Sequence, residues 1–229
     1  MRAQYVGLPV APLLTQPPPI VVEVPDAEVL RLSGGQSADG YYIPNTNIIV
    51  VSASTARDPA LLNEVILHEM NHYAGWRGHG FNNAFSNGGT LSAMPNLVWL
   101  EEGLANSGSS GLIGATTRPI AYPYETMTAV LLERVAGPAA VREAYASGDY
   151  RRLQQIVNER LGEGTFETVI GLRQRPDGST ISNGAEALDF LRGAIERNPG
   201  SADMGAFWAD PRIQRSTATI REEMRSGMD

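Results

Sequence analysis

The stretch His68-Glu69-Met70-Asn71-His72, which has the pattern H-E-x-x-H, constrains this chain more than any other segment. In an α-helix, residues four positions apart lie on the same face, so two imidazoles can bind one metal ion. The carboxylate between them then faces the water on that ion and can accept its proton. We therefore expect His68 and His72 to be metal ligands and Glu69 to be a general base.

The residues before this motif predict a small sheet followed by the motif helix. The expected strands cover residues 20–24, 29–32, 41–43 and 48–51, the last two being joined by a turn at residues 44–47. Asp58 and Pro59 supply an N-cap and a proline at the first helical position, and apolar residues continue at helical spacing to His72. The motif is thus expected on a helix that begins near Pro59.

The residues after the motif predict a loop and then helices. Residues 75–96 are rich in Gly, Asn and Ser, so we expect a long loop across the site. A second helix is expected to carry Glu101 and Glu102, with Glu101 as a surface charge. Helical spacing recurs over residues 122–197. From residue 201 the pattern is weak, which predicts a peripheral helix or a partly disordered tail.

Composition limits the class of protein. A chain of 229 residues can bury a core, and its lack of cysteine means that histidine and carboxylate must hold any metal. The formal charge of −7, without a basic cluster, argues against nucleic acid as a partner. No apolar run approaches the roughly 20 residues of a membrane span. We expect a soluble chain, cytoplasmic or exported by a route without a recognisable signal peptide; nothing indicates an oligomeric state.

The segment from Trp99 to Ala105, W-L-E-E-G-L-A, resembles the W-L-x-E-G-x-A helix of the gluzincin metallopeptidases, the clan of the thermolysin-like enzymes. The resemblance implies that Glu102 is the third ligand of one zinc ion per chain. It also implies that Asn106, one turn later, orients a ligand histidine, and that the substrate is a protein or peptide. The specific motifs cover residues 40–107, and the gap between His72 and Glu102 is longer than in those enzymes.

The same resemblance gives the expected fold class, which is α+β with a zincin-like arrangement. A small N-terminal mixed sheet with the active-site helix is followed by a mostly helical C-terminal lobe. The expected divisions are an extended Pro-rich arm at residues 1–19, a subdomain with both motif helices at 20–115, a helical subdomain at 116–200, and a tail at 201–229.

An additional donor normally steadies the oxyanion in such sites. Tyr124, near the start of the helix after the site, resembles the tyrosine found there in related enzymes and is taken as the catalytic candidate. Tyr122 is nearly as well placed. Core packing is the commoner role for either side chain.

Three alternatives stay open. The metzincin pattern H-E-x-x-H-x-x-G-x-x-H matches at Gly75, and residues 92–95 resemble its Met-turn, but His79 falls one residue late with Gly78 at the ligand position. All 18 basic residues are arginine. The codon usage of a GC-rich genome explains this composition, and a toxin or effector protease delivered into a foreign cytosol is the alternative explanation. A metallopeptidase-like binding domain without turnover is the third, although it would have no chemical need for Glu69.

Overall fold

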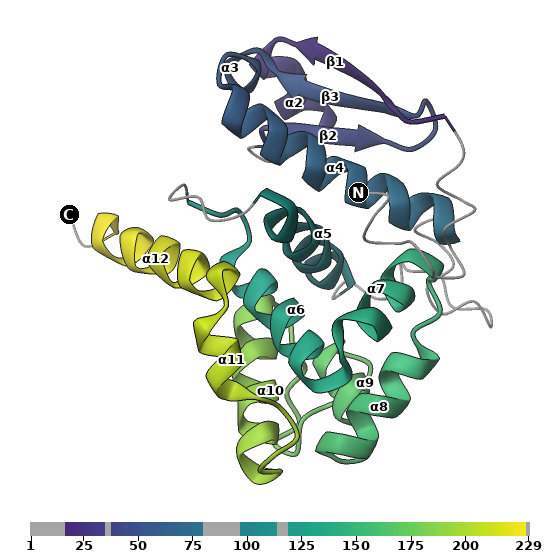
Figure 1. Cartoon of the computed structure of the whole chain (residues 1–229), viewed down its shortest axis with the longest axis vertical. Helices are drawn as coiled ribbons and strands as arrows, with labels where there is room; N and C mark the ends of the chain where they lie inside the picture. The colour runs from purple at the N-terminus through teal and green to yellow at the C-terminus, as the bar shows by residue number, and fades with distance from the viewer. Residues whose placement is uncertain (1–16, 35–37, 80–96, 114–118, 228–229) are drawn as a thin grey trace.

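The chain forms an α+β fold with a small mixed sheet at one end and helices through the rest (Figure 1). The computed structural model describes residues 17–34, 38–79, 97–113 and 119–227. The N-terminal elements are β1 (Ile20–Val24), α2 (Asp26–Leu32), β2 (Gly40–Ile43), β3 (Ile48–Ser52), α3 (Ala53–Ala56) and α4 (Pro59–His79). The later helices are α5 (Leu97–Ile113), α6 (Pro123–Ala136), α7 (Pro138–Ser147), α8 (Arg151–Leu161), α9 (Thr165–Val169), α10 (Gly184–Arg197), α11 (Met204–Ala209) and α12 (Pro211–Ser226).

The sheet has the strand order β1-β3-β2, with β1 parallel and β2 antiparallel to β3. The predicted hairpin is confirmed, and its turn contains Asn47 at φ 55°, a left-handed conformation that asparagine tolerates. Side chains of Ile49 and Val51 on β3 are buried with Tyr42 of β2 against α4. In contrast, the side chains at the first four positions of β1 are exposed.

The strand predicted at residues 29–32 is wrong, because these residues belong to α2. A short apolar run does not distinguish a strand from one face of a helix. Two local features favour the helix. Asp26 and Glu28 lie in its first turn, and Glu28 pairs with Arg31 one turn later at 2.6 Å. Only Val29 of this helix is buried.

Helix α4 begins where expected but ends later. Asp58 Oδ1 accepts hydrogen bonds from the N–H groups of Ala60 and Leu61, at 3.1 and 3.2 Å. The loop predicted from residue 75 is wrong for its first part, because α4 continues to His79. Gly75 lies inside the helix and against α7, where an added Cβ would be 3.3 Å from Tyr145 Cζ. This glycine permits close helix packing and does not end the helix; residues 80–96 lie outside the described residues.

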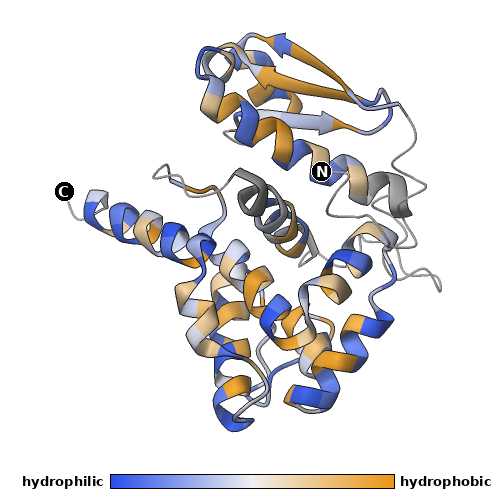
Figure 2. Cartoon of the chain, viewed as in Figure 1, coloured by the Kyte–Doolittle hydropathy of each residue, from blue (hydrophilic) through white to orange (hydrophobic). Residues whose placement is uncertain are grey.

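The main core lies in the helical part, around α6. Helices α5, α7, α8, α10, α11 and α12 all contact α6, whose residues 129–132 are completely buried. Figure 2 shows apolar residues on the strands and within this helical part, with much of the hydrophilic colouring on α8 and α12. Helix α5 lies between α4 and α6 and joins the sheet end to the helical end (Figure 1). The predicted subdomain boundary at residues 115 and 116 falls outside the described residues.

The tail predicted from residue 201 is mostly helical and packs on the core. Phe207 of α11 and Ile213 of α12 are fully buried. Asp210 caps α12 and Pro211 occupies its first position, the same signal as Asp58-Pro59 before α4. Within the described ranges, no helix is long and apolar enough to cross a membrane.

Candidate metal centre

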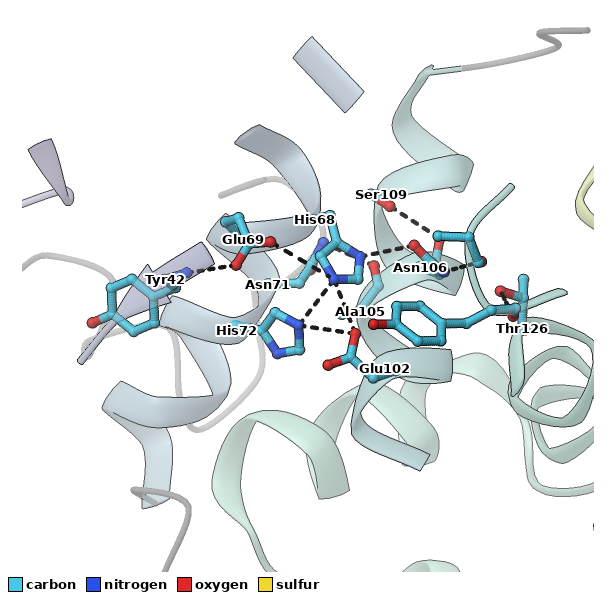
Figure 3. A network of polar contacts seen from close by, with 12 residues as sticks. Tyr42, His68, Glu69, Asn71, His72, Glu102, Ala105, Asn106, Ser109 and Thr126 are labelled. Carbon is cyan, nitrogen blue, oxygen red and sulfur yellow. Dashed lines mark hydrogen bonds and ion pairs between the residues drawn. The ribbon is translucent and has the colours of Figure 1, made fainter. Parts of the chain in front are cut away.

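His68 and His72 of α4 and Glu102 of α5 form a group that could hold a metal ion. The two Nε2 atoms are 3.0 Å apart, and Glu102 Oε2 lies 3.1 Å from the first and 3.4 Å from the second (Figure 3). Nitrogen and oxygen ligands of a tetrahedral zinc ion, at about 2.0–2.2 Å from the metal, are separated from one another by about 3.3 Å. The spacing of the three donor atoms is thus compatible with the binding of one small metal ion.

The two ligand helices meet through Asn71, the fourth residue of the H-E-x-x-H motif. Its side-chain nitrogen donates to the carbonyl oxygens of Leu67 in α4, at 2.8 Å, and Ala105 in α5, at 3.3 Å. Gly108 lies against the same amide, since an added Cβ would be 2.9 Å from Asn71 Oδ1. A buried amide and a small residue therefore set the spacing of α4 and α5 near the ligands.

Gly103 fixes α5 from the opposite side. A Cβ at this position would overlap the backbone carbonyl of Glu125 in the first turn of α6. Because backbone atoms cannot move aside as a flexible side chain can, only glycine fits. The glycine after Glu102 thus lets α5 approach α6 closely while the carboxylate faces α4.

Asn106 orients His68. Its Oδ1 lies 2.8 Å from His68 Nδ1, and its Nδ2 donates to the carbonyl oxygen of Ala121. Because the amide nitrogen is used by Ala121, the amide oxygen must accept from a protonated Nδ1. This tautomer leaves His68 Nε2 as the lone-pair donor toward a metal.

The edge strand β2 holds Glu69. The backbone N–H of Tyr42 donates to Glu69 Oε2 at 2.8 Å, while Oε1 lies 4.0 Å from His68 Nε2 (Figure 3). The carboxyl group is buried. One oxygen is thus fixed to the sheet, and the other lies on the side of His68.

In the metal-free protein, His72 and Glu102 form a pair of opposite charges. Burial lowers the pKa of His72, but the carboxylate of Glu102 outweighs this, with further contributions from Glu69 and Glu101, and the pKa rises to about 9. Burial likewise raises the pKa of Glu102, but His72 and His68 together bring it well below its usual range. A proton on His72 therefore occupies the charge position that a metal ion would take.

Glu101 was expected to be a surface charge, and this is wrong. Its side chain is buried and accepts a hydrogen bond from the hydroxyl of Tyr150 at 3.2 Å. Burial raises the pKa of Glu101 to about 7, although His72 and Tyr150 oppose the shift. Adjacent helical residues point about 100° apart, so Glu101 faces the start of α8 while Glu102 faces α4.

The structure places Tyr122, rather than Tyr124, beside His68 of the candidate metal centre. The Tyr122 ring is stacked on that of His68, with centroids 6.4 Å apart and planes 17° apart. Burial, together with the charges of Glu102 and Glu69, raises the pKa of the Tyr122 phenol to about 12. Tyr124 instead packs on the edge of the helical core.

The metzincin alternative requires a tight turn at Gly75, and this turn is absent from α4, which is helical through that residue. The side chain of His79 lies outside the described residues, as does the segment compared with a Met-turn. Comparison of the chain with protein-family models, curated proteins and solved structures gave no match.

Proposed function

We propose that this chain is a zinc-dependent peptidase in which His68, His72 and Glu102 bind the metal. The observation that carries the proposal is the triangle of three donor atoms with sides of 3.0, 3.1 and 3.4 Å beside a buried carboxylate, Glu69. A donor set of two imidazoles and one carboxylate, with an open fourth position, is typical of catalytic zinc. The helical conformation of Gly75 favours Glu102 over His79 as the third ligand.

Glu69 is the proposed general base. A zinc ion bound here would lower the pKa of its water toward about 7 and polarise the substrate carbonyl. Because Glu69 Oε2 is already bonded to the Tyr42 N–H, we assign proton transfer to Oε1, which lies on the side of the ligands. Oε1 takes the proton from the attacking water and gives it to the leaving amine.

Tyr122 is the proposed donor to the developing oxyanion, in place of Tyr124. With a pKa of about 12 its phenol keeps its proton at neutral pH and can act only as a hydrogen-bond donor to an anion. Its ring is stacked on a ligand histidine, and its side chain is 40% exposed, so a substrate can reach it.

The choice of a peptide as substrate depends on the resemblance of residues 99–105 to gluzincins. The test is hydrolysis of fluorescence-quenched casein and of a mixed peptide library by the zinc-loaded chain. Glu69→Gln is the matched control, because it keeps the side-chain volume and removes the base. Cleavage by the wild type alone, at equal zinc content, supports a peptidase. Zinc bound without cleavage in either chain would instead support the metal-binding domain without turnover.

A further inference from the structure

Residues 119–122, here called the wall segment, form one side of the metal centre. The carbonyl oxygen of Ala121 accepts from the side chain of Asn106, which in turn binds His68 Nδ1. The next residue, Tyr122, stacks its ring on the His68 imidazole. A displacement of the wall segment would therefore act on His68 through both its nitrogen and its ring face.

The wall segment has a backbone conformation that needs support. Tyr122 lies at φ 52° and ψ 55°, in the left-handed region that a bulky side chain rarely adopts. Such a conformation persists only where the surrounding contacts stabilise it. The carbonyl oxygen of Tyr122 accepts from the backbone N–H and the hydroxyl of Thr126, which holds it to α6 from one side only.

Helix α12, almost 100 residues later, holds the other end of this segment. Arg215 Nη2 donates to the carbonyl oxygen of Pro119 at 3.2 Å, and Thr219 Oγ1 accepts from the N–H of Ile120 at 2.9 Å. Ile120 and Thr219 are buried, so water does not easily replace the bond between them.

Arg215 also connects α12 to the motif helix. Its guanidinium lies 2.5 Å from Glu64 Oε1, and both side chains are largely buried. Glu64 precedes His68 by one helical turn on α4, so the two residues lie on the same face. One arginine thus contacts the wall segment and the helix that carries two ligands.

We propose that α12 positions the metal centre, with Thr219 and Arg215 as positioning residues that act on His68 through the wall segment. Thr219 holds Ile120, and through Ala121 and Asn106 it sets the orientation of the imidazole. Arg215 binds both the start of the same segment, at Pro119, and Glu64 of α4, and so fixes their relative position. The inference depends on the proposed function only in treating His68 as a metal ligand.

Thr219→Val tests the proposal, because it keeps the β-branched shape and removes the acceptor for the Ile120 N–H. Thr217→Val on the same helix is the matched control. The first readout is the set of imidazole proton resonances of the metal-free protein, which contains three histidines. Movement of Tyr122 changes the ring-current shift of His68, so its resonances should move in Thr219→Val and stay in place in Thr217→Val.

The second readout is the affinity for Zn²⁺ alone, which should fall about 10- to 100-fold in Thr219→Val, as for other residues that orient a ligand. If the threonine acts through Asn106, the losses of Thr219→Val and Asn106→Ala will not add in the double variant. The double substitution Glu64→Met with Arg215→Met tests the second contact without leaving a buried charge unpaired. It should also move the His68 resonances.

Unchanged His68 resonances in Thr219→Val, or fully additive losses with Asn106→Ala, would overturn the proposal. Failure of the proposed function gives a different result. If the wild-type chain does not bind zinc, or binds it without hydrolysis, the proposed function fails. The comparison of His68 resonances between the metal-free wild type and Thr219→Val still tests the positioning role.

Discussion

Proton competition at His72 should make zinc binding strongly pH-dependent. The pKa of this imidazole rises from 6.5 to about 9 in the folded metal-free protein, mainly because Glu102 outweighs the effect of burial. A metal ion must displace that proton, so the apparent affinity should fall about tenfold for each pH unit below about 9. Between about pH 8.5 and 6.5 we expect a loss of about 100-fold, which corresponds to about 2.7 kcal/mol.

Stability of the metal-free protein should change in the opposite direction. A pKa that is raised on folding contributes stability that is complete below the unfolded value of 6.5 and is lost as the pH rises through about 9. The rise of the His72 pKa from 6.5 to about 9 sets an upper limit of about 3.4 kcal/mol on this loss. The chelated protein should therefore melt at a lower temperature at about pH 9 than at about pH 6.5.

Competition with a zinc-binding dye at each pH measures the first trend, and thermal unfolding in chelator measures the second. Two adjacent substitutions provide the controls. Glu102→Gln removes the main cause of the shift and should flatten the pH dependence of residual binding above about pH 6.5. Glu101→Gln keeps an acceptor for Tyr150 and should retain the slope, although Glu101 itself has a pKa of about 7. A zinc affinity independent of pH, or an equal slope in Glu102→Gln, would refute the reasoning.

Three further outcomes are expected. Glu69→Gln should keep one zinc per chain by metal analysis and lose about 10²- to 10⁴-fold in turnover, since only the base is removed; unchanged turnover would exclude Glu69 from the chemistry. Purified Glu102→Ala should lose zinc while His79→Ala keeps it, and the reverse result would favour the metzincin arrangement. Gly103→Ala should destabilise the fold by about 1–3 kcal/mol in denaturant unfolding because its Cβ meets the Glu125 backbone, whereas Gly193→Ala, with only the end of Arg197 nearby, should be neutral or stabilising.

The elements of the fold that local chemistry determines could be predicted from the sequence. Capping residues and helical periodicity located the start of α4, and the hairpin turn located β2 and β3, because each signal lies within a few residues of its effect. The short helix α2 was predicted as a strand because seven residues give too little periodicity to separate the two. Helix α4 continues through Gly75, where it packs against Tyr145 of α7, about 70 residues away in the chain, and a contact so distant in sequence leaves no local signal.

In the candidate site, too, the features set by neighbouring residues could be predicted, and those set by distant packing could not. The spacing of His68 and His72 placed both imidazoles on one helical face, and this is a local property. Glu101 and Glu102 could not be separated by burial, because residues 99–109 of α5 are all buried or half-buried and neighbouring apolar residues flank both. The position of Tyr122 depends on a left-handed backbone conformation that contacts with α6 and α12 support. No glycine or asparagine, the residues typical of this conformation, lies nearby in the sequence to indicate it.

The strand order separates β1 from the candidate site. β1 is bonded to β3 along one side, its first four side chains are exposed, and β2 with the Tyr42 N–H lies on the other side of β3. Opening of β1 would thus expose little apolar surface and break no bond to Glu69. In amide hydrogen exchange, β1 should lose protection through local fraying, while the Tyr42 amide, which is bonded to Glu69, should exchange only when β2 separates from α4. The terminal strand can therefore fluctuate without loosening the carboxylate that we assign to proton transfer.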